Sequence, residues 1–107
     1  MSWQVKTTPS FWRTVKELKP DYSREELADI LRSIDDCIRE LEEKGRVEET
    51  GWSEHELRRY PFDDGGHFEF CIYNDDILVV YFRVLRKRTI RMVGVYSHRS
   101  IPGSKRG

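Results

Sequence analysis

The sequence has little cysteine, and its two cysteines are not arranged for a metal site or a disulfide framework. Cys37 falls in a segment with helical periodicity and Cys71 in one with alternating periodicity. No C-x-x-C pair accompanies them, and no histidine stands at metal-ligand spacing. We therefore expect no metal and no cofactor, and we expect both thiols to be small apolar residues in a reducing compartment.

Long apolar runs are also missing. No stretch approaches the roughly 18 apolar residues of a membrane span, and the first residues lack the apolar run of a signal peptide. Apolar residues make up 37% and charged residues 36% of the 107 positions, a composition typical of a globular chain. We expect one cytoplasmic domain over residues 1–100, a mobile basic tail over 101–107, and no membrane contact.

The most informative absence is that of carboxylates near the end of the chain. Ile77–Gly107 holds 8 basic residues and no acidic one. Residues 1–56 hold 9 basic and 14 acidic residues, whereas 57–107 hold 10 and 5, so the net charge of zero hides a separation of signs. Protection of a strand edge against aggregation would explain a basic turn at Arg86–Arg88 but not the whole stretch. We expect this half of the chain to bind a polyanion, RNA in the first place.

The first half of the chain predicts one short strand and two helices. Alternation at Trp3–Thr7 predicts the strand. Ser10 is the predicted N-cap of a short helix that ends before Pro20. Ser23–Gly45 repeats apolar residues at three-and-four spacing and begins with a capping box that Glu26 completes, which predicts a longer helix.

The second half predicts an antiparallel meander after an irregular connection over residues 46–66. That connection has the composition for a single helical turn at Ser53–Glu56. The fold class is therefore α+β, with an N-terminal strand and a helical hairpin packed on one face of a small antiparallel sheet. The three expected strands are His67–Tyr73, Ile77–Leu85 and Thr89–Tyr96, of which the central one is covered on both faces. The turns between them are Asn74–Asp76 and Arg86–Arg88.

This order of elements resembles that of bacterial RelE/ParE-type toxins of toxin–antitoxin systems. Within that superfamily, the YafQ-like branch has a histidine followed two residues later by leucine, an acidic hairpin turn, and a histidine that closes the last strand. His55-Glu56-Leu57, Asp75-Asp76 and His98 follow the same order here. The connection at 60–66 is longer than usual, and the zero net charge departs from these commonly basic toxins. The other segments that carry the resemblance are Thr8–Arg13, Lys16–Leu18, Asp75–Tyr81 and Val93–His98.

The resemblance implies a RelE-like mRNA interferase. Its target would be mRNA in the ribosomal A site, cut without metal to leave a 2′,3′-cyclic phosphate, and a cognate acidic antitoxin would inhibit it. Such cleavage needs a base, an acid and cations around the phosphate. His98 and His55 are the candidates for proton transfer, and Arg83 is the candidate phosphate ligand. Asp76 orients a histidine, assists proton transfer, or serves only its turn.

Substrate binding is expected on the sheet face that the helices leave open. If the helices cover Leu78, Val80, Phe82 and Val84, then Tyr81 and Arg83 look onto that face and can stack a base and clamp a phosphate. Arg91 and Arg99 have the reach to join Tyr81 and Arg83. Tyr96 is either a stacking platform or a core residue. Contact with a more distant RNA backbone is expected of Arg86, Lys87 and Arg88.

Plainer interpretations remain open at this point. His55 can be a surface histidine, His98 can bind backbone at a strand end, and His67 is expected to be structural rather than catalytic. The alternative functions are a ParE-like toxin that inhibits gyrase and a non-catalytic RNA- or protein-binding module.

Overall fold

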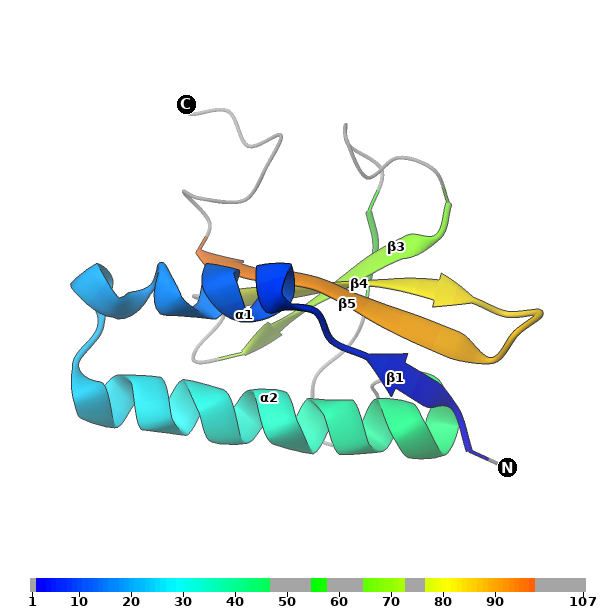
Figure 1. Ribbon diagram of the computed structural model, residues 1–107, viewed down its shortest axis with the longest axis horizontal. Helices are drawn as coiled ribbons and strands as arrows, with labels where there is room; N and C mark the ends of the chain where they lie inside the picture. Colours follow the sequence, from blue (N-terminus) through cyan, green and yellow to red (C-terminus); the bar gives the residue numbers. More distant parts are fainter. Residues whose placement is uncertain (1, 47–54, 58–64, 73–76, 98–107) are drawn as a thin grey trace.

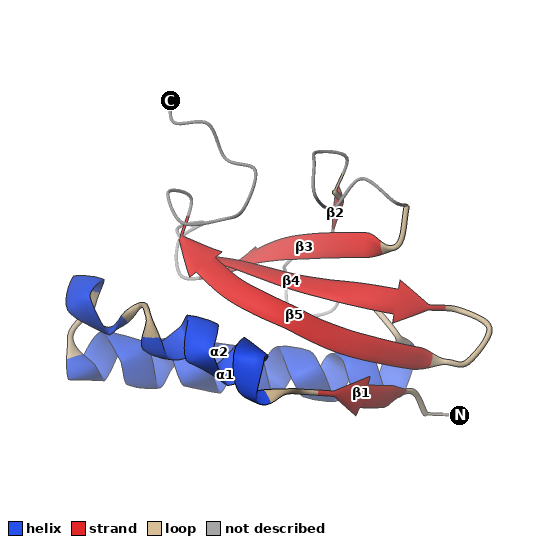
Figure 2. Ribbon diagram, turned by 45° about the horizontal axis from the view of Figure 1, so that its top comes forward, coloured by secondary structure: helices blue, strands red, loops and turns tan. Residues whose placement is uncertain are grey.

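The chain folds into a layer of two helices packed against one face of a five-stranded sheet (Figures 1 and 2). The computed structural model describes residues 2–46, 55–57, 65–72 and 77–97. Sheet order is β1-β5-β4-β3-β2. The elements are β1 (Gln4–Lys6), α1 (Pro9–Lys16), a 3-10 turn (Lys19–Asp21), α2 (Arg24–Lys44), β2 (His55–Glu56), β3 (His67–Ile72), β4 (Ile77–Val84) and β5 (Thr89–Ser97).

The two helices form where the sequence predicts them, with one cap misplaced. The capping box of α2 is confirmed, because the Ser23 amide donates to Glu26 Oε1 at 2.8 Å and the Glu26 amide donates to Ser23 Oγ at 3.1 Å. The N-cap of α1 is Thr8 and not Ser10, since Thr8 Oγ1 accepts from the Phe11 amide at 3.2 Å. Proline lacks an amide hydrogen and suits the first helical position, so Pro9 favours a start directly after Thr8.

The predicted meander of β3, β4 and β5 is confirmed, and two short strands complete the sheet. β1 pairs with β5 in parallel, so the sheet is mixed rather than purely antiparallel. β2 pairs antiparallel with β3. The helical turn expected at Ser53–Glu56 is therefore wrong for His55 and Glu56, which lie in a strand, while Ser53 and Glu54 lie outside the described residues.

One face of the sheet is buried under the helices. Phe70, Val79 and Tyr81 join a core with Phe11 and Ile34 from the helices. The expectation that the helices cover Leu78, Val80, Phe82 and Val84 is thus wrong, because the opposite parity of β4 faces them. β4 is apolar on both parities, so its own pattern could not show which side faces the helices. Its register with β3, whose residues alternate, does show it.

The other face, called the open face below, carries no helix (Figure 2). A small apolar cluster occupies its middle, where Leu57, Leu78 and Val80 are buried and Tyr96 packs against them. The open face is defined by Lys6 on β1, by His67, Glu69 and Cys71 on β3, by Leu78, Val80 and Phe82 on β4, and by Arg91, Val93, Gly94 and Tyr96 on β5.

A β-bulge changes the parity of β5 halfway along the strand. Val80 pairs with Gly94 while the next residue, Tyr81, pairs with Met92, which leaves Val93 as an extra residue. Beyond the bulge the backbone is tied to α1, since the Val95 amide donates to Thr14 Oγ1 at 2.9 Å. The bulge allows Met92 and Val95 both to enter the core although their numbers differ by three.

Candidate functional site

A row of four residues runs across the open face at one end of the sheet. The register pairs Lys6 with Arg91, Arg91 with Phe82, and Phe82 with His67, so one residue from each of β1, β5, β4 and β3 lies in line. Neighbouring strands lie about 4.8 Å apart, so the row spans roughly 15 Å.

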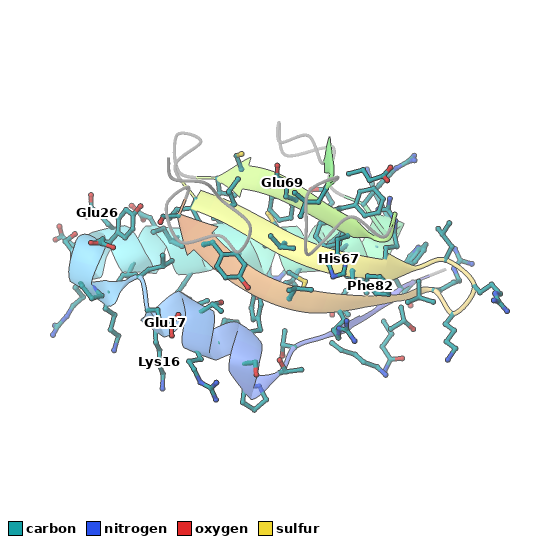
Figure 3. The ribbon with its side chains drawn as sticks, turned by 90° about the horizontal axis from the view of Figure 1, so that it is seen from above. Lys16, Glu17, Glu26, His67, Glu69 and Phe82 are labelled. Atoms are coloured by element: carbon teal, nitrogen blue, oxygen red, sulfur yellow. The ribbon has the colours of Figure 1, made fainter. Side chains whose placement is uncertain are left out.

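Phe82 is the centre of this row. Its ring centroid lies 4.8 Å from that of His67 at an interplanar angle of 56°, and the Arg91 guanidinium lies 5.3 Å from it. Gly66 leaves room for the ring, because a side-chain carbon at that position would overlap Phe82. Figure 3 looks onto the open face and shows His67 and Phe82 together near one end of the sheet. The row therefore combines an aromatic ring, an imidazole and two cations.

Glu69 brings a carboxylate to the same face, two residues beyond His67 (Figure 3). Its Oε1 atom is buried and has no hydrogen-bond partner in the part of the chain that the structure describes. A buried polar atom without a partner is costly, and such atoms are few in native structures. Glu69 is thus a carboxylate whose hydrogen-bonding capacity the described part of the fold does not use.

Glu69 and Phe82 are residues that the sequence analysis missed. The signal for Glu69 was available, because it shares the parity of His67 and opposes that of Phe68 and Phe70. The signal for Phe82 was not, since choosing it required knowing which parity of β4 faces the helices. His67, expected to be structural, takes part in the row.

His55 reaches the sheet through its backbone. β2 places His55 opposite Glu69 in the register, and the Leu57 amide donates to the His67 carbonyl at 2.9 Å. Leu57 is buried against the apolar cluster of the open face. The segment that holds His55 is therefore docked on the meander, as a two-histidine mechanism requires. His98, Asp76 and Arg99 lie outside the described residues.

Tyr81 and Arg83 do not lie on the open face, so their expected position is wrong. Tyr81 is fully buried and its ring stacks at 6.0 Å on Phe68 within the core. Arg83 Nη1 donates to the Gly45 carbonyl at 2.8 Å, and the guanidinium lies 4.0 Å from the centroid of the Phe68 ring. Both side chains follow the helix-facing parity of β4, and Arg83 serves the end of α2.

Tyr96 lies on the open face but far from Arg83. Its ring packs over Gly94, where a side-chain carbon would overlap it. Burial raises the pKa of the Tyr96 hydroxyl, and the Glu17 carboxylate raises it further. Tyr96 pairs with Leu78 and Arg83 with Ile90, so they stand at opposite ends of β4, about 17 Å apart along the strand. Tyr96 and Arg83 therefore do not meet at one site.

The basic turn between β4 and β5 is partly used by the fold. Arg86 and Lys87 are exposed at its tip. Arg88 has a positive φ of 49°, its carbonyl accepts from the Gln4 amide at 2.9 Å, and its guanidinium lies 5.6 Å from the Trp3 ring. Arg88 thus holds β1 against the hairpin, whereas Arg86 and Lys87 project from it.

Among the residues that the structure describes, no three His, Cys, Asp or Glu side chains are grouped to hold a metal ion. Over the same residues, neither helix is long and apolar enough to cross a membrane. Cys37 and Cys71 are free thiols, and Cys37 is buried.

Solved structures share this arrangement of helices and strands. A metal-bound toxin from Helicobacter pylori is 17% identical over 92% of this chain and 98% of its own, with a TM-score of 0.60. A chain of the RelBE2 toxin–antitoxin complex from Mycobacterium tuberculosis is 16% identical over 91% of this chain and 99% of its own, with a TM-score of 0.57. The fold is that of the RelE-like toxins. No family model and no curated protein matches the sequence, so the RelE-like fold rests on the backbone.

Proposed function

We propose that this chain is the toxin of a type II toxin–antitoxin system and an endoribonuclease that cleaves mRNA without a metal on the open face. The observation that carries the proposal is the meeting of Glu69, with its unpartnered buried oxygen, and the row from His67 to Lys6. The RelE-like fold and its structural neighbours, a toxin and a chain of a toxin–antitoxin complex, support the same assignment.

The chemistry is an internal transfer at one phosphate of the RNA. The 2′-oxygen attacks phosphorus, its proton passes to a base, the bond from phosphorus to the 5′-oxygen breaks, and an acid protonates that oxygen. The products are a 2′,3′-cyclic phosphate and a 5′-hydroxyl. Glu69 is the base in this scheme, and His67, about 7 Å along the strand, is one candidate acid. His55 and His98 remain candidates for either transfer.

Binding of the RNA follows from the order of the row. Arg91 and Lys6 neutralise phosphates, and Phe82 offers a ring edge or face to a nucleobase. Arg86 and Lys87 at the hairpin tip reach a second stretch of phosphate backbone, which in this proposal belongs to the ribosome. Asp76 and Arg99 remain expectations for the far end of the open face.

The regulatory partner in this proposal is a cognate antitoxin. One of the structural neighbours is a toxin–antitoxin complex, which supports a partner of this kind. An antitoxin that covers the open face should be acidic there, because the row carries two cations opposite a single carboxylate.

The test compares cleavage by isosteric variants. Purified chain is incubated with a labelled RNA, with and without ribosomes, and with the same strand carrying a 2′-deoxy sugar at the cut site. Glu69→Gln and His67→Gln should each lower the cleavage rate by about 100-fold or more, the usual worth of a general acid or base. Arg39→Gln, on the exposed side of α2, is the control and should cleave normally.

Four results would count against the proposal. Cleavage of the 2′-deoxy strand would exclude attack by the 2′-oxygen. Full activity of Glu69→Gln and His67→Gln, with loss in His55→Ala and His98→Ala, would move the acid and base to that pair of histidines. A chain that arrests growth but cleaves no RNA, with or without ribosomes, would favour the gyrase-directed alternative, and one that binds RNA without either effect would be a binding module.

A further inference from the structure

Lys6 stands on the shortest strand that contributes to the row on the open face. That strand, β1, has three residues, lies at the edge of the sheet and pairs with β5 in parallel. Parallel pairs are slightly less stable per residue than antiparallel ones. The register also sets Lys6 beside Arg91, and like charges on neighbouring strands repel. Within the described part of the chain, neither cation forms a salt bridge with a carboxylate. β1 therefore needs an anchor outside the sheet.

Trp3 supplies that anchor from the opposite side of the sheet. Trp3 and Val5 share one parity and pack against the core under the helices, whereas Lys6 has the other parity. The Trp3 ring lies over Gly45, the residue that ends α2, where a side-chain carbon would overlap it. The Trp3 amide donates to the Glu42 carbonyl in the last turn of α2 at 2.7 Å. Figure 1 shows β1 beside that end of the helix. The end of α2 thus fixes the position of β1.

Arg88 contacts the same strand from the turn between β4 and β5. Its guanidinium lies 5.6 Å from the centroid of the Trp3 ring, and its carbonyl accepts from the Gln4 amide at 2.9 Å. Arg88 has a φ of 49°, a conformation that is unfavourable for residues other than glycine. The contacts with β1 offset that cost. Trp3 is therefore held both by α2 and by the basic turn.

We propose that Trp3 is a positioning residue for RNA binding: its ring, seated on Gly45, holds β1 where Lys6 meets a phosphate beside Arg91. The inference rests on the proposed binding of RNA at the row. Trp3 lies on the helix-facing side of the sheet, so it does not touch RNA on the open face, and its effect passes through Lys6. A bound phosphate would also relieve the repulsion between Lys6 and Arg91.

The test measures RNA affinity against salt concentration for the purified full chain. The probe is a single-stranded RNA that carries a 2′-deoxy sugar at the cut site. Each phosphate contact contributes about −0.7 to the slope of log affinity against log salt, so Trp3→Ala and Lys6→Gln should each make the slope shallower by about 0.7. The double variant should be no shallower than either single variant, because the two residues act through one contact.

Gly45→Ala disturbs the same anchor from the side of α2. The added carbon would displace the Trp3 ring, so the slope should again become shallower by about 0.7. In the Trp3→Ala background it should change the slope no further. Gly45→Ala therefore carries the test on its own if Trp3→Ala does not fold. Trp3→Phe keeps a ring over Gly45 and should restore at least half of the slope that Trp3→Ala loses.

Steady-state cleavage separates positioning from chemistry. Lys6 lies three strands away from Glu69, since β5 and β4 stand between β1 and β3. Loss of a substrate contact at that distance from the base removes binding alone. Trp3→Ala should therefore raise KM by about twofold or more and leave kcat within about twofold of the unaltered chain.

Thr14→Val is the matched control for a loss of stability. It breaks the hydrogen bond between the Val95 amide and α1, away from β1, and should keep the slope of the unaltered chain. All slopes are measured at a temperature at which circular dichroism shows each variant to be folded.

Three outcomes would overturn the inference. They are a folded Trp3→Ala with the slope of the unaltered chain, a double variant whose loss of slope equals the sum of the two single losses, and an unchanged slope in Lys6→Gln. Failure of the proposed function has a different signature. A chain that shows the expected slopes but cleaves no RNA would retain the role of Trp3 and lose the nuclease assignment.

Discussion

The guanidinium of Arg83 on β4 donates a hydrogen bond of 2.8 Å to the carbonyl of Gly45, the residue that ends α2. It joins the sheet to a helix end whose last carbonyls have no partner within the helix. The same guanidinium lies over the Phe68 ring at 4.0 Å. Arg83 therefore stabilises the fold by joining β4 to the end of α2.

Replacement of Arg83 should lower stability. Arg83→Met keeps the apolar stem and removes the donor, so the free energy of unfolding should fall by about 1–3 kcal/mol in urea titrations. Arg86→Met at the exposed tip should change it by less than about 0.5 kcal/mol. If Arg83→Met had normal stability but failed to bind RNA, Arg83 would instead be a substrate-binding residue.

Thr14 supports the bulge in β5 from the helix. Its Oγ1 accepts from the Val95 amide at 2.9 Å and donates to the Phe11 carbonyl at 2.6 Å. Thr14→Val is nearly isosteric and leaves the Val95 amide unpaired, so it should cost about 1–3 kcal/mol in the free energy of unfolding. Thr14→Ser keeps the hydroxyl and should cost less than half of that. Hydrogen exchange at the Val95 amide should quicken in Thr14→Val alone; unchanged exchange there would contradict this role.

Cys37 should make the protein less stable in alkaline solution. Burial raises the pKa of its thiol far above the ordinary value of 9.0, and the carboxylates of Glu40 and Asp36 raise it further. The unfolded chain loses this proton as pH rises past 9.0, whereas the native chain keeps it, so stability present below that pH is lost above it.

Urea titrations between about pH 8 and pH 10 would measure the effect. The free energy of unfolding should decline by up to about 1.4 kcal/mol per pH unit from this group. Cys37→Ala lacks the thiol and should show a shallower decline, although its stability at neutral pH is lower because of the cavity. Parallel declines in the two proteins would show that Cys37 does not ionise on unfolding.

The row on the open face predicts a salt dependence for RNA binding. Each phosphate contact contributes about −0.7 to the slope of log affinity against log salt for a single strand. Arg91→Gln and Lys6→Gln should each make the slope shallower by about that amount, as measured with an RNA that carries a 2′-deoxy sugar at the cut site. Arg39→Gln should leave it unchanged. Unaltered slopes in both Arg91→Gln and Lys6→Gln would remove the row from the binding surface.

Local rules predicted most of the elements. The apolar spacing and capping box of α2, and the alternation of β3, are determined by neighbouring residues, so the sequence alone defines them. β2 was missed because two residues carry no periodicity, and its pairing with β3 depends on contacts distant in sequence.

The candidate site was only half predictable for a related reason. His55 was chosen by resemblance, and Arg91 and Tyr96 by residue type. The sheet holds all three, although only the backbone of His55 is described. Tyr81 was chosen by parity, and the apolar character of both faces of β4 left that parity undetermined. When a strand is buried on both sides, its sequence pattern does not show which side the helices cover.

The extra residue Val93 has a consequence for how this protein is compared with others. Before it, odd positions of β5 such as Arg91 face outward; after it, even positions such as Tyr96 do. β5 thus behaves as two short strands in opposite phase. If a sequence alignment places no gap at Val93, it will match residues of the open face in one protein to core residues in another. A functional residue would then seem to be missing although it lies one position away.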